Sequence, residues 1–317
     1  MKSTIIIPNY NGISFVETCL NSLEQEDAHV IVVDNASTDG SYELICEKFP
    51  EVETIRLKNN TGFCKAVNEG IAASDTEYVI LLNNDTQVQP GFVNELERIM
   101  DRDDNIFSAA AKMISMYDRD KIDDAGDLYC SLGWAFAIGK GKPERNYSKC
   151  HSIFSSCAGA AIYRKSILDE IGLLDENHFA YLEDVDLGYR AQIYGYRNVF
   201  APRARAYHAG SAVSGSRYNE FKADLTARNS IYIIYKNMPY AQIVLNLPFL
   251  MIGFGIKILF FISKGLGTVY IRGLLKGIRL SVSPEGRKRK IKYSKANFIS
   301  YCKIQMFLWL NTIKRLV

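Results

Sequence analysis

The chain has 317 residues, of which 48% are hydrophobic and 23% are charged, and its formal net charge is +3. This length and apolar content exclude a disordered chain and predict one large catalytic domain with an appendage. The seven cysteines include no C-x-x-C pair, so neither a disulfide framework nor a zinc site is indicated. The N-terminus shows no apolar stretch of a signal peptide, and a reducing cytoplasm is the expected compartment.

The charge is unevenly distributed along the chain. Residues 241–317 hold 14 basic residues and one acidic residue, a net charge of +13. Residues 1–240 hold 24 basic and 34 acidic residues, a net charge of −10. This asymmetry predicts a catalytic domain over 1–240 and a basic tail over 241–317 that contacts an anionic partner.

Strand-like and helix-like segments alternate over the first 110 residues. Apolar, β-rich runs occupy residues 3–7, 30–33, 53–57 and 78–82. Apolar residues at helical spacing occupy 13–23 and 62–73, and a further helix is expected after Pro90-Gly91. Repeated strand–helix units predict right-handed crossovers and a mainly parallel, Rossmann-like α/β sheet flanked by helices.

Each of these predicted strands ends in polar residues. The ends are, in chain order, Asn9-Tyr10-Asn11, Asp34-Asn35, Asn59-Asn60 and Asn83-Asn84-Asp85. Because ligands of open α/β sheets bind beyond the carboxyl ends of the strands, the four ends together predict a pocket. The sequence contains neither a dinucleotide fingerprint nor a P-loop, so a classical dinucleotide or P-loop site is not supported.

Two of the strand ends allow more than one interpretation. Asp34 can accept a hydrogen bond from a base or a ribose, with the Tyr10 ring as a stacking face. Alternatively, Asp34 belongs to the cap of the following helix. Asp85 offers a hard oxygen ligand for Mg²⁺ or Mn²⁺, although the same segment also suits a simple turn.

A second acidic cluster, Glu183-Asp184-Val185-Asp186, lies far along the chain. Its acids suit the first turn of a helix, in which Asp186 would pair with Arg190 at i+4. A carboxylate held there could instead act as a general base toward an alcohol. His208 lies in a polar segment that contains glycine, where a metal or phosphate contact and plain exposure are both compatible with the sequence.

These segments resemble, in the same order, the signatures of family 2 glycosyltransferases. The matching segments are Ile5-Ile6-Ile7-Pro8-Asn9-Tyr10-Asn11-Gly12, Val32-Val33-Asp34-Asn35-Ala36-Ser37-Thr38-Asp39-Gly40, Asn60-Thr61-Gly62-Phe63, Leu81-Leu82-Asn83-Asn84-Asp85 and Glu183-Asp184-Val185-Asp186-Leu187. The resemblance covers residues 1 to about 235 and is nearest to the bacterial rhamnosyltransferase-like branch. It implies a GT-A fold, a nucleotide-sugar donor and inversion at the anomeric carbon.

The resemblance also implies a role for individual residues. Asp184 would be the catalytic base, and Asp85 with His208 would hold a divalent cation, Mg²⁺ or Mn²⁺. Asn83 replaces the first acid of the family's D-x-D-like motif. A donor linked to dTDP or UDP would be bound by Pro8, Tyr10, Asp34, Asn60, Gly62, Lys65, Asn83 and Asn84. Residues 1–115 would form the nucleotide-sugar half and 116–240 the acceptor half, with the small residues of 156–161 beside the acceptor.

The implied function is that of a metal-dependent hexosyltransferase-type enzyme. It would add one sugar, rhamnose in this branch, to a lipid-linked or saccharide acceptor during synthesis of bacterial cell-wall or other surface polysaccharide. The Q-x-x-R-W sequence of processive members is absent, so one sugar per encounter is expected. Two alternatives stay open, an inactive sugar-binding scaffold of the same fold and a sugar nucleotidyltransferase.

The tail predicts contact with a membrane. Residues 243–262 are almost wholly apolar and about long enough to cross a bilayer, although spanning is not required. After Gly265, basic residues at 272, 276 and 279 oppose an apolar face, and a polybasic cluster follows at 287–292. We expect a peripheral or weakly integral protein at the cytoplasmic face of the cell membrane, bound to anionic lipid rather than nucleic acid. A helical subdomain packed on the catalytic domain is the alternative.

Overall fold

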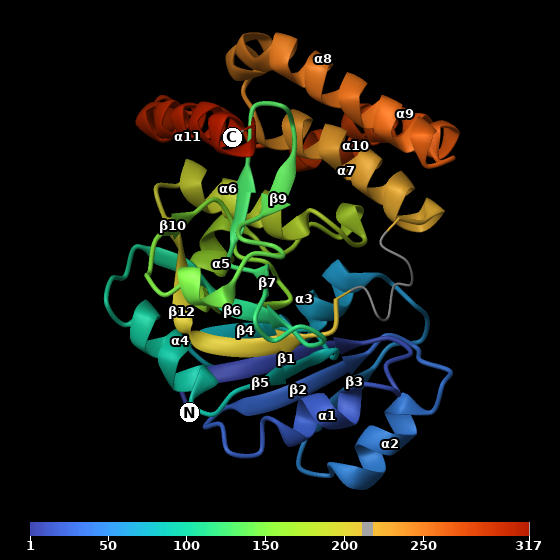
Figure 1. Ribbon diagram of the computed structural model, residues 1–317, viewed down its shortest axis with the longest axis vertical. Helices are drawn as coiled ribbons and strands as arrows, with labels where there is room; N and C mark the ends of the chain where they lie inside the picture. Colours follow the sequence, from blue (N-terminus) through green and yellow to red (C-terminus); the bar gives the residue numbers. More distant parts are fainter. Residues whose placement is uncertain (211–217, 317) are drawn as a thin grey trace.

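The structure is a computed structural model that describes residues 1–210 and 218–316. Ten of the described strands form one mixed sheet at the centre of Figure 1, and β8 and β9 form a separate hairpin. The sheet order is β10-β12-β6-β11-β4-β1-β2-β3, with β5 paired to β12 and β7 to β6. The strands are β1 (Ser3–Asn9), β2 (His29–Asp34), β3 (Glu53–Arg56), β4 (Tyr78–Leu82), β5 (Thr86–Val88), β6 (Ile106–Ser115), β7 (Ile122–Asp124), β8 (Asp127–Tyr129), β9 (Ala135–Ala137), β10 (Ser152–Ile153), β11 (Ala160–Arg164) and β12 (Arg197–His208).

Helices cover both faces of this sheet. The first six are α1 (Val16–Asn21), α2 (Ser41–Lys48), α3 (Phe63–Ala73), α4 (Phe92–Met100), α5 (Lys165–Ile171) and α6 (Glu183–Ile193). Side chains of β1 alternate between two cores, because Ile5 and Ile7 pack with α1 and α4 whereas Ile6 packs with α3 and α6. Glu26 fixes the start of α4 by accepting hydrogen bonds from the backbone N–H groups of Gly91 and Val93, at 2.7 and 2.8 Å.

The predicted α/β fold with a central sheet flanked by helices is confirmed. β3, β2, β1 and β4 are parallel, as the alternation of strands and helices predicted. The remainder of the sheet is mixed, since β11 runs antiparallel to both of its neighbours, β4 and β6. No helix precedes β11 within residues 154–159, so β11 is not the second strand of a crossover unit.

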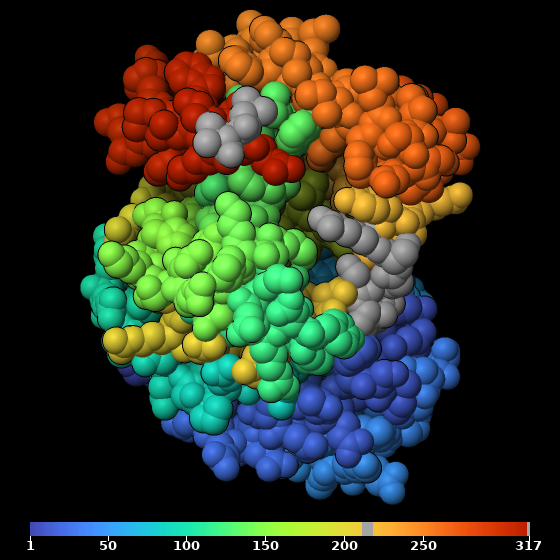
Figure 2. Space-filling view, in the orientation of Figure 1, coloured from blue at the N-terminus to red at the C-terminus, as the bar shows by residue number. Residues whose placement is uncertain are grey.

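The C-terminal helices gather at the end of the molecule opposite α1 and α2 (Figure 1). They are α7 (Glu220–Asn237), α8 (Tyr240–Ser263), α9 (Gly267–Val282), α10 (Pro284–Arg289) and α11 (Phe298–Leu316). Figure 2 shows the helices after residue 240, in orange and red, covering that end. Leu250 and Leu308 from these helices share a core with Tyr129 and Tyr189. The predicted boundary at 240 lies at the break between α7 and α8, and the division into domains stays a prediction.

Helix α8 is the one described helix long and apolar enough to cross a membrane, with a mean hydropathy of 2.1 over its best window. Only 17% of that window is buried within the protein. Gly253, on its inner side, lies so close to Leu132 that an added Cβ would come within 2.1 Å of the Leu132 carbonyl oxygen. The helix therefore packs on the protein along one side and exposes an apolar surface along the other.

Candidate active site

A cavity of about 840 Å³ lies between the carboxyl ends of β1, β2 and β4 and the C-terminal helices. Asp85, which follows β4, and Asp184, in the first turn of α6, both line this cavity. The two aspartates that the sequence singled out are thus brought to one pocket from positions 99 residues apart. Of the other predicted site residues, Pro8, Tyr10, Asn60, Gly62, Asn83, Asn84 and His208 also line it.

Asp34 lies beneath the pocket floor and does not line the cavity. Its carboxylate is fully buried and accepts hydrogen bonds from the Asn9 side-chain amide at 3.0 Å and from the Ser37 backbone N–H at 3.1 Å. Asn9 in turn accepts from the Asn84 amide at 2.7 Å. Asp34 therefore organises the loop after β2 and the polar floor, and its neighbour Asn35 lines the pocket.

The segment after β3 reaches the pocket through three residues, Asn60, Gly62 and Phe63. The Asn60 side-chain oxygen accepts from the backbone N–H of Gly62 and from the Asn35 amide, each at 3.0 Å. Gly62 has φ +88°, and an added Cβ would come within 2.6 Å of the Phe179 ring. A side chain is therefore excluded at this position. Lys65 does not line the cavity, and its ammonium lies 4.0 Å from the Glu176 carboxylate.

Asp85 and His208 are neighbours because β5 and β12 are paired with Thr86 opposite His208. The His208 Nε2 atom lies 3.3 Å from an Asp85 oxygen, and its Nδ1 atom lies 2.7 Å from Asp123. Burial alone would lower the pKa of His208, but its contacts with Asp123 and Asp85 raise it to about 9. No local sequence pattern indicated Asp123, which fixes the orientation of the imidazole ring.

This arrangement fits a divalent cation. Asp85 and His208 present an oxygen and a nitrogen to the same pocket, 3.3 Å apart. Two ligands of one octahedral ion lie roughly 3 Å apart, so one ion can contact both atoms. A histidine whose other nitrogen contacts a carboxylate is typical of metal ligands, and Asp123 provides that carboxylate.

The Asp184 carboxylate has an unusually high pKa for an aspartate in the first turn of a helix. It is half-buried, and desolvation raises its pKa to about 6, although it accepts a hydrogen bond from the Val185 N–H at 2.7 Å. Burial raises the pKa of the adjacent Glu183 to about 8, with a further contribution from the Asp184 charge. Such a pair can hold or accept a proton near neutral pH, as a general base must.

The segment before Asp184 has a strained backbone. Phe179, Tyr181 and Leu182 have φ values of 62°, 71° and 67°, which residues other than glycine rarely adopt. The Asn229 amide of α7 holds this segment by donating to the carbonyls of residues 178, 180 and 181 at 3.0, 2.9 and 2.7 Å. Residues 179–184 all line the pocket, so α7 fixes the approach to Asp184.

Asp186 has the structural role that its helical position predicted. It is fully buried, and its carboxylate contacts Arg190 at 3.0 Å and Lys236 at 2.8 Å. Burial would raise its pKa, but these two cations lower it. Lys236 also contacts Asp175 at 2.8 Å and thereby joins α7 to the loop before the strained segment.

The pocket contains several residues that sequence patterns did not indicate. Asp127 of β8 lines it beside Cys157, Ala158 and Gly159, which belong to the predicted small-residue stretch. The ligand atoms of Asp124, Asp127 and Cys157 lie close enough together to contact one metal ion. Burial raises the pKa of both carboxyls, to about 7 for Asp124. No local signal marks Asp124 or Asp127, because they come together with Cys157 only through the fold.

Comparison with known proteins agrees with this architecture. In sequence, the chain is similar to the N-acetylglucosaminyl-diphospho-decaprenol L-rhamnosyltransferase of Mycobacterium tuberculosis, with 27% identity over 239 residues that cover 64% of this chain and 75% of that protein. In structure, it is similar to GalNAc-T7 crystallised with UDP, GalNAc and Mn²⁺, with a TM-score of 0.60 and 15% identity over 74% of this chain and 48% of that one. It is also similar to the mannosyltransferase PcManGT of Pyrobaculum calidifontis in complex with GDP-Man and Mn²⁺, with a TM-score of 0.54 and 15% identity over 96% and 87% of the two chains.

The two structural similarities, at 15% identity, establish the GT-A type of fold and nothing further. The family is established by sequence. The model of the family described as "Glycosyl transferase family 2" matches residues 4–172, more than half of the chain. These residues run from β1 through α5 and include the strand ends that carry Tyr10, Asn60 and Asp85. The chain belongs to glycosyl transferase family 2.

Proposed function

We propose that this enzyme transfers one sugar, with inversion, from a nucleotide-diphosphate sugar to a hydroxyl of a lipid-linked acceptor during synthesis of bacterial cell-surface polysaccharide. The observation that carries the proposal is the presence of Asp85 and Asp184 in one cavity. A displacement with inversion needs a group that receives the acceptor proton and a separate group that stabilises the leaving diphosphate. Two carboxylates from different elements can fill these two roles.

Asp184 is proposed as the base. Its pKa of about 6 leaves the carboxylate ionised at neutral pH, while its raised basicity favours uptake of a proton from the acceptor hydroxyl. The strained segment 179–182, held by Asn229, keeps the Asp184 carboxylate at the pocket. Ordering the base in this way lowers the cost of reaching a reactive geometry.

The strand ends are proposed as the donor site. Pro8, Tyr10, Asn35 and Asn60 line the nucleotide side of the cavity, and Asn83 and Asn84 lie next to Asp85. Asp85 and His208 would hold Mg²⁺ or Mn²⁺, which supplies positive charge for the leaving diphosphate when it is bound. Asp34 and Lys65 do not line the cavity, so we assign Asp34 to the support of the floor and give Lys65 no contact with the donor.

The identity of the sugar is proposed from the printed name of the relative from Mycobacterium tuberculosis, which describes an L-rhamnosyltransferase that acts on N-acetylglucosaminyl-diphospho-decaprenol. We therefore propose rhamnose, carried on dTDP or UDP, as the transferred sugar and a polyprenyl-diphosphate saccharide as the acceptor. A lipid acceptor also agrees with the apolar surface of the C-terminal helices.

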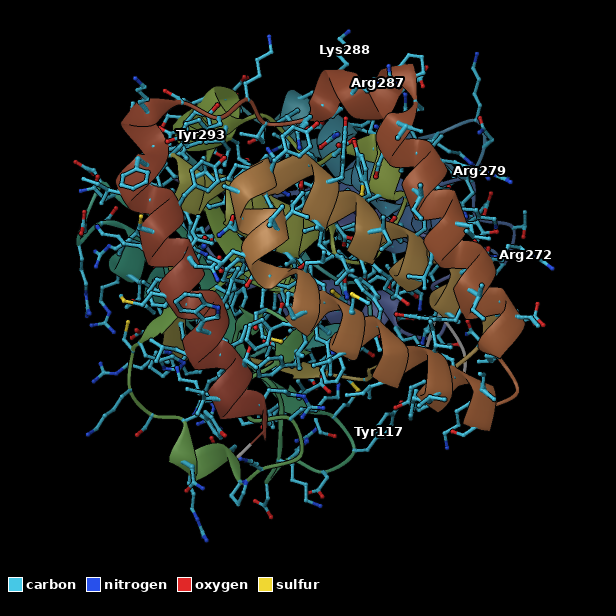
Figure 3. All side chains as sticks on the ribbon, turned by 90° about the horizontal axis from the view of Figure 1, so that it is seen from above. Tyr117, Arg272, Arg279, Arg287, Lys288 and Tyr293 are labelled. Atoms are coloured by element: carbon cyan, nitrogen blue, oxygen red, sulfur yellow. The ribbon has the colours of Figure 1, made fainter. Side chains whose placement is uncertain are left out.

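That surface is proposed to bind the membrane from the cytoplasmic side. The helices lie next to one another across one end of the molecule, where Arg272, Arg279, Arg287 and Lys288 project at the periphery (Figure 3). Large apolar side chains are exposed among them, including Met251, Leu259, Ile271, Leu275, Trp309 and Ile313. Apolar side chains bordered by basic residues are typical of a surface that inserts into the interface of an anionic bilayer.

The test is sugar transfer by the purified enzyme in detergent. The wild type is given a panel of nucleotide sugars, N-acetylglucosaminyl-diphospho-decaprenol as acceptor, and Mn²⁺. Asp184→Asn should lower kcat by roughly 10²- to 10⁴-fold with little change in donor affinity. Asp169→Asn, which changes a carboxylate of α5 that is 63% exposed, is the matched control and should leave kcat unchanged.

Three outcomes would contradict the proposal. An Asp184→Asn enzyme with near-normal kcat removes the base assignment. A wild type that binds nucleotide sugars but neither transfers nor hydrolyses them indicates a sugar-binding scaffold. Formation of a nucleotide sugar from a sugar phosphate and a nucleoside triphosphate indicates a nucleotidyltransferase.

A further inference from the structure

The active-site cavity extends from the strand ends to the membrane-facing helices. Besides Asp184, its lining includes Lys257 and Phe260 of α8 and Ala135 and Phe136 of the β8–β9 hairpin. The Tyr218 and Phe260 rings are in edge contact, with centroids 5.3 Å apart. The cavity therefore has a polar end at the sheet and a largely aromatic end at α8.

Lys257 is the basic residue that α8 contributes to this cavity. Its side chain is half-buried, and its ammonium lies 5.9 Å from the Trp134 ring centroid. Trp134 is fixed in turn by donating its indole N–H to the Gly253 carbonyl at 3.1 Å. Lys257 forms no ion pair with any residue that the structure describes, whereas His208, which also lines the cavity, contacts Asp85 and Asp123.

Helix α8 has an exposed apolar side and a side that lines the cavity, and Lys257 lies on the cavity side. Ile252, Ile256 and Leu259, on the outer side of the helix, are 57%, 48% and 69% exposed. Lys257 instead points inward, toward the cavity that contains Asp184. A partly desolvated ammonium without a carboxylate favours an anionic ligand, and the adjacent apolar surface favours a hydrocarbon chain.

We propose that Lys257 binds a phosphate of a polyprenyl-diphosphate acceptor at the α8 end of the cavity. The hydrocarbon chain would leave over the outer side of α8, and the saccharide would extend toward Asp184. This inference rests on the proposed function, because it assigns a binding residue for the acceptor of that reaction. Trp134 acts as a positioning residue that holds the ammonium at the cavity wall.

A binding experiment tests the inference without catalysis. The chain has two tryptophans, so Trp309→Phe leaves Trp134 as the reporter next to Lys257. Farnesyl diphosphate should change the Trp134 fluorescence and bind at least about tenfold more weakly after Lys257→Met, which removes a charged hydrogen bond. Lys257→Arg should restore most of the affinity, which separates loss of charge from loss of folding. Farnesol should bind both enzymes equally.

Lys264→Met is the matched control. Lys264 follows α8, is exposed, and also lies 5.9 Å from an aromatic centroid, that of Phe260, but it does not line the cavity. This variant should bind farnesyl diphosphate as the parent does. Equal affinity of the parent and Lys257→Met would overturn the inference, and so would an equal loss in Lys257→Met and Lys264→Met.

Transfer assays separate this inference from the proposed function. Lys257→Met should raise the KM for N-acetylglucosaminyl-diphospho-decaprenol at least about tenfold. It should leave the KM for octyl N-acetylglucosaminide, which lacks the diphosphate, unchanged. Equal effects on both acceptors overturn the role of Lys257 while the glycosyltransferase function stands. Loss of all transfer by the wild type, with farnesyl diphosphate binding retained, overturns the function instead.

Discussion

Replacement of Lys236 by methionine should strongly destabilise this enzyme. Lys236 is 3% exposed, and its ammonium contacts Asp175 and Asp186, each at 2.8 Å. Methionine has a similar volume but no charge, so the substitution leaves two carboxylates buried without this cation. Asp186 keeps Arg190, whereas Asp175 keeps only neutral partners such as the Tyr232 hydroxyl at 2.9 Å.

The expected loss is about 3–5 kcal/mol in the free energy of unfolding, the usual cost of removing one partner from a buried ion pair. Lys276→Met provides the comparison, because Lys276 of α9 forms an exposed ion pair with Asp224 of α7. Lys276 contacts Asp224 at 2.8 Å but is 46% exposed, so its loss should cost less than about 1 kcal/mol. The difference between the two variants measures the effect of burial on the same kind of contact.

The pH dependence provides a second check. Burial would raise the pKa of Asp175 and Asp186, but Lys236 lowers both below the unfolded value of about 3.9. Groups with lowered pKa stabilise the fold above the unfolded pKa, and this contribution is lost as the pH falls through the folded pKa. The difference in the free energy of unfolding between wild type and Lys236→Met should therefore be largest at pH 7 and decrease below about pH 4.

Urea denaturation in detergent, followed by circular dichroism, measures these differences. Lys236→Met/Asp175→Asn should recover part of the stability lost by Lys236→Met, because the second change removes an uncompensated buried charge. The stabilising role of the buried Lys236 is refuted if Lys236→Met loses no more stability than Lys276→Met. It is also refuted if the double variant is less stable than Lys236→Met alone.

Four further outcomes are expected from the pocket. With the pKa of Asp184 at about 6, kcat measured across pH should rise tenfold per unit below pH 6 and level off above it, as a deprotonated base requires. Gly62→Ala should lower kcat, because its Cβ meets the Phe179 ring, and Gly40→Ala, with nothing within 4 Å, is the control for positive φ. Asn229→Ala should lower kcat and the melting temperature together, since three carbonyls of the strained segment each lose one hydrogen bond. EDTA should weaken donor binding measured by calorimetry in the wild type, and Asp85→Asn should show little further effect of EDTA.

The sequence predicted the parallel half of the fold well. Apolar strands that alternate with helical segments place their carboxyl ends at one edge, so polar residues such as Asn60 and Asp85 could be assigned to one pocket. No range was predicted for helix α2, although a helix after Asp34 was one alternative, and only Ser41 and Ile45 of its residues are buried. Such a helix has a weak apolar pattern, because little of its surface faces the core.

The residues that complete the pocket could not be read from local patterns. Asp123 contacts His208 across 85 positions, and Asn229 contacts Tyr181 across 48. Asp34 shows that a polar residue at a strand end need not face the cavity, because its side chain supports the pocket floor instead. Periodicity identifies the element and its edge, whereas the side-chain partners depend on packing between distant elements.

Helix α7 connects the two features proposed for the chain, which are the catalytic base and the membrane-binding surface. On one side, Asn229 and Lys236 hold the segments that lead to Asp184. On the other side, α7 packs so closely on α9 that a Cβ at Gly273 would come within 2.6 Å of the Asp224 carbonyl oxygen, and one at Gly277 within 2.5 Å of that of residue 228. A face of small residues brings the two helices together and leaves the large apolar side chains of α9 exposed on the surface. Under the proposed function, the same helix would position both the Asp184 base and the membrane-binding surface, so that the cavity would face the bilayer from which a lipid-linked acceptor enters.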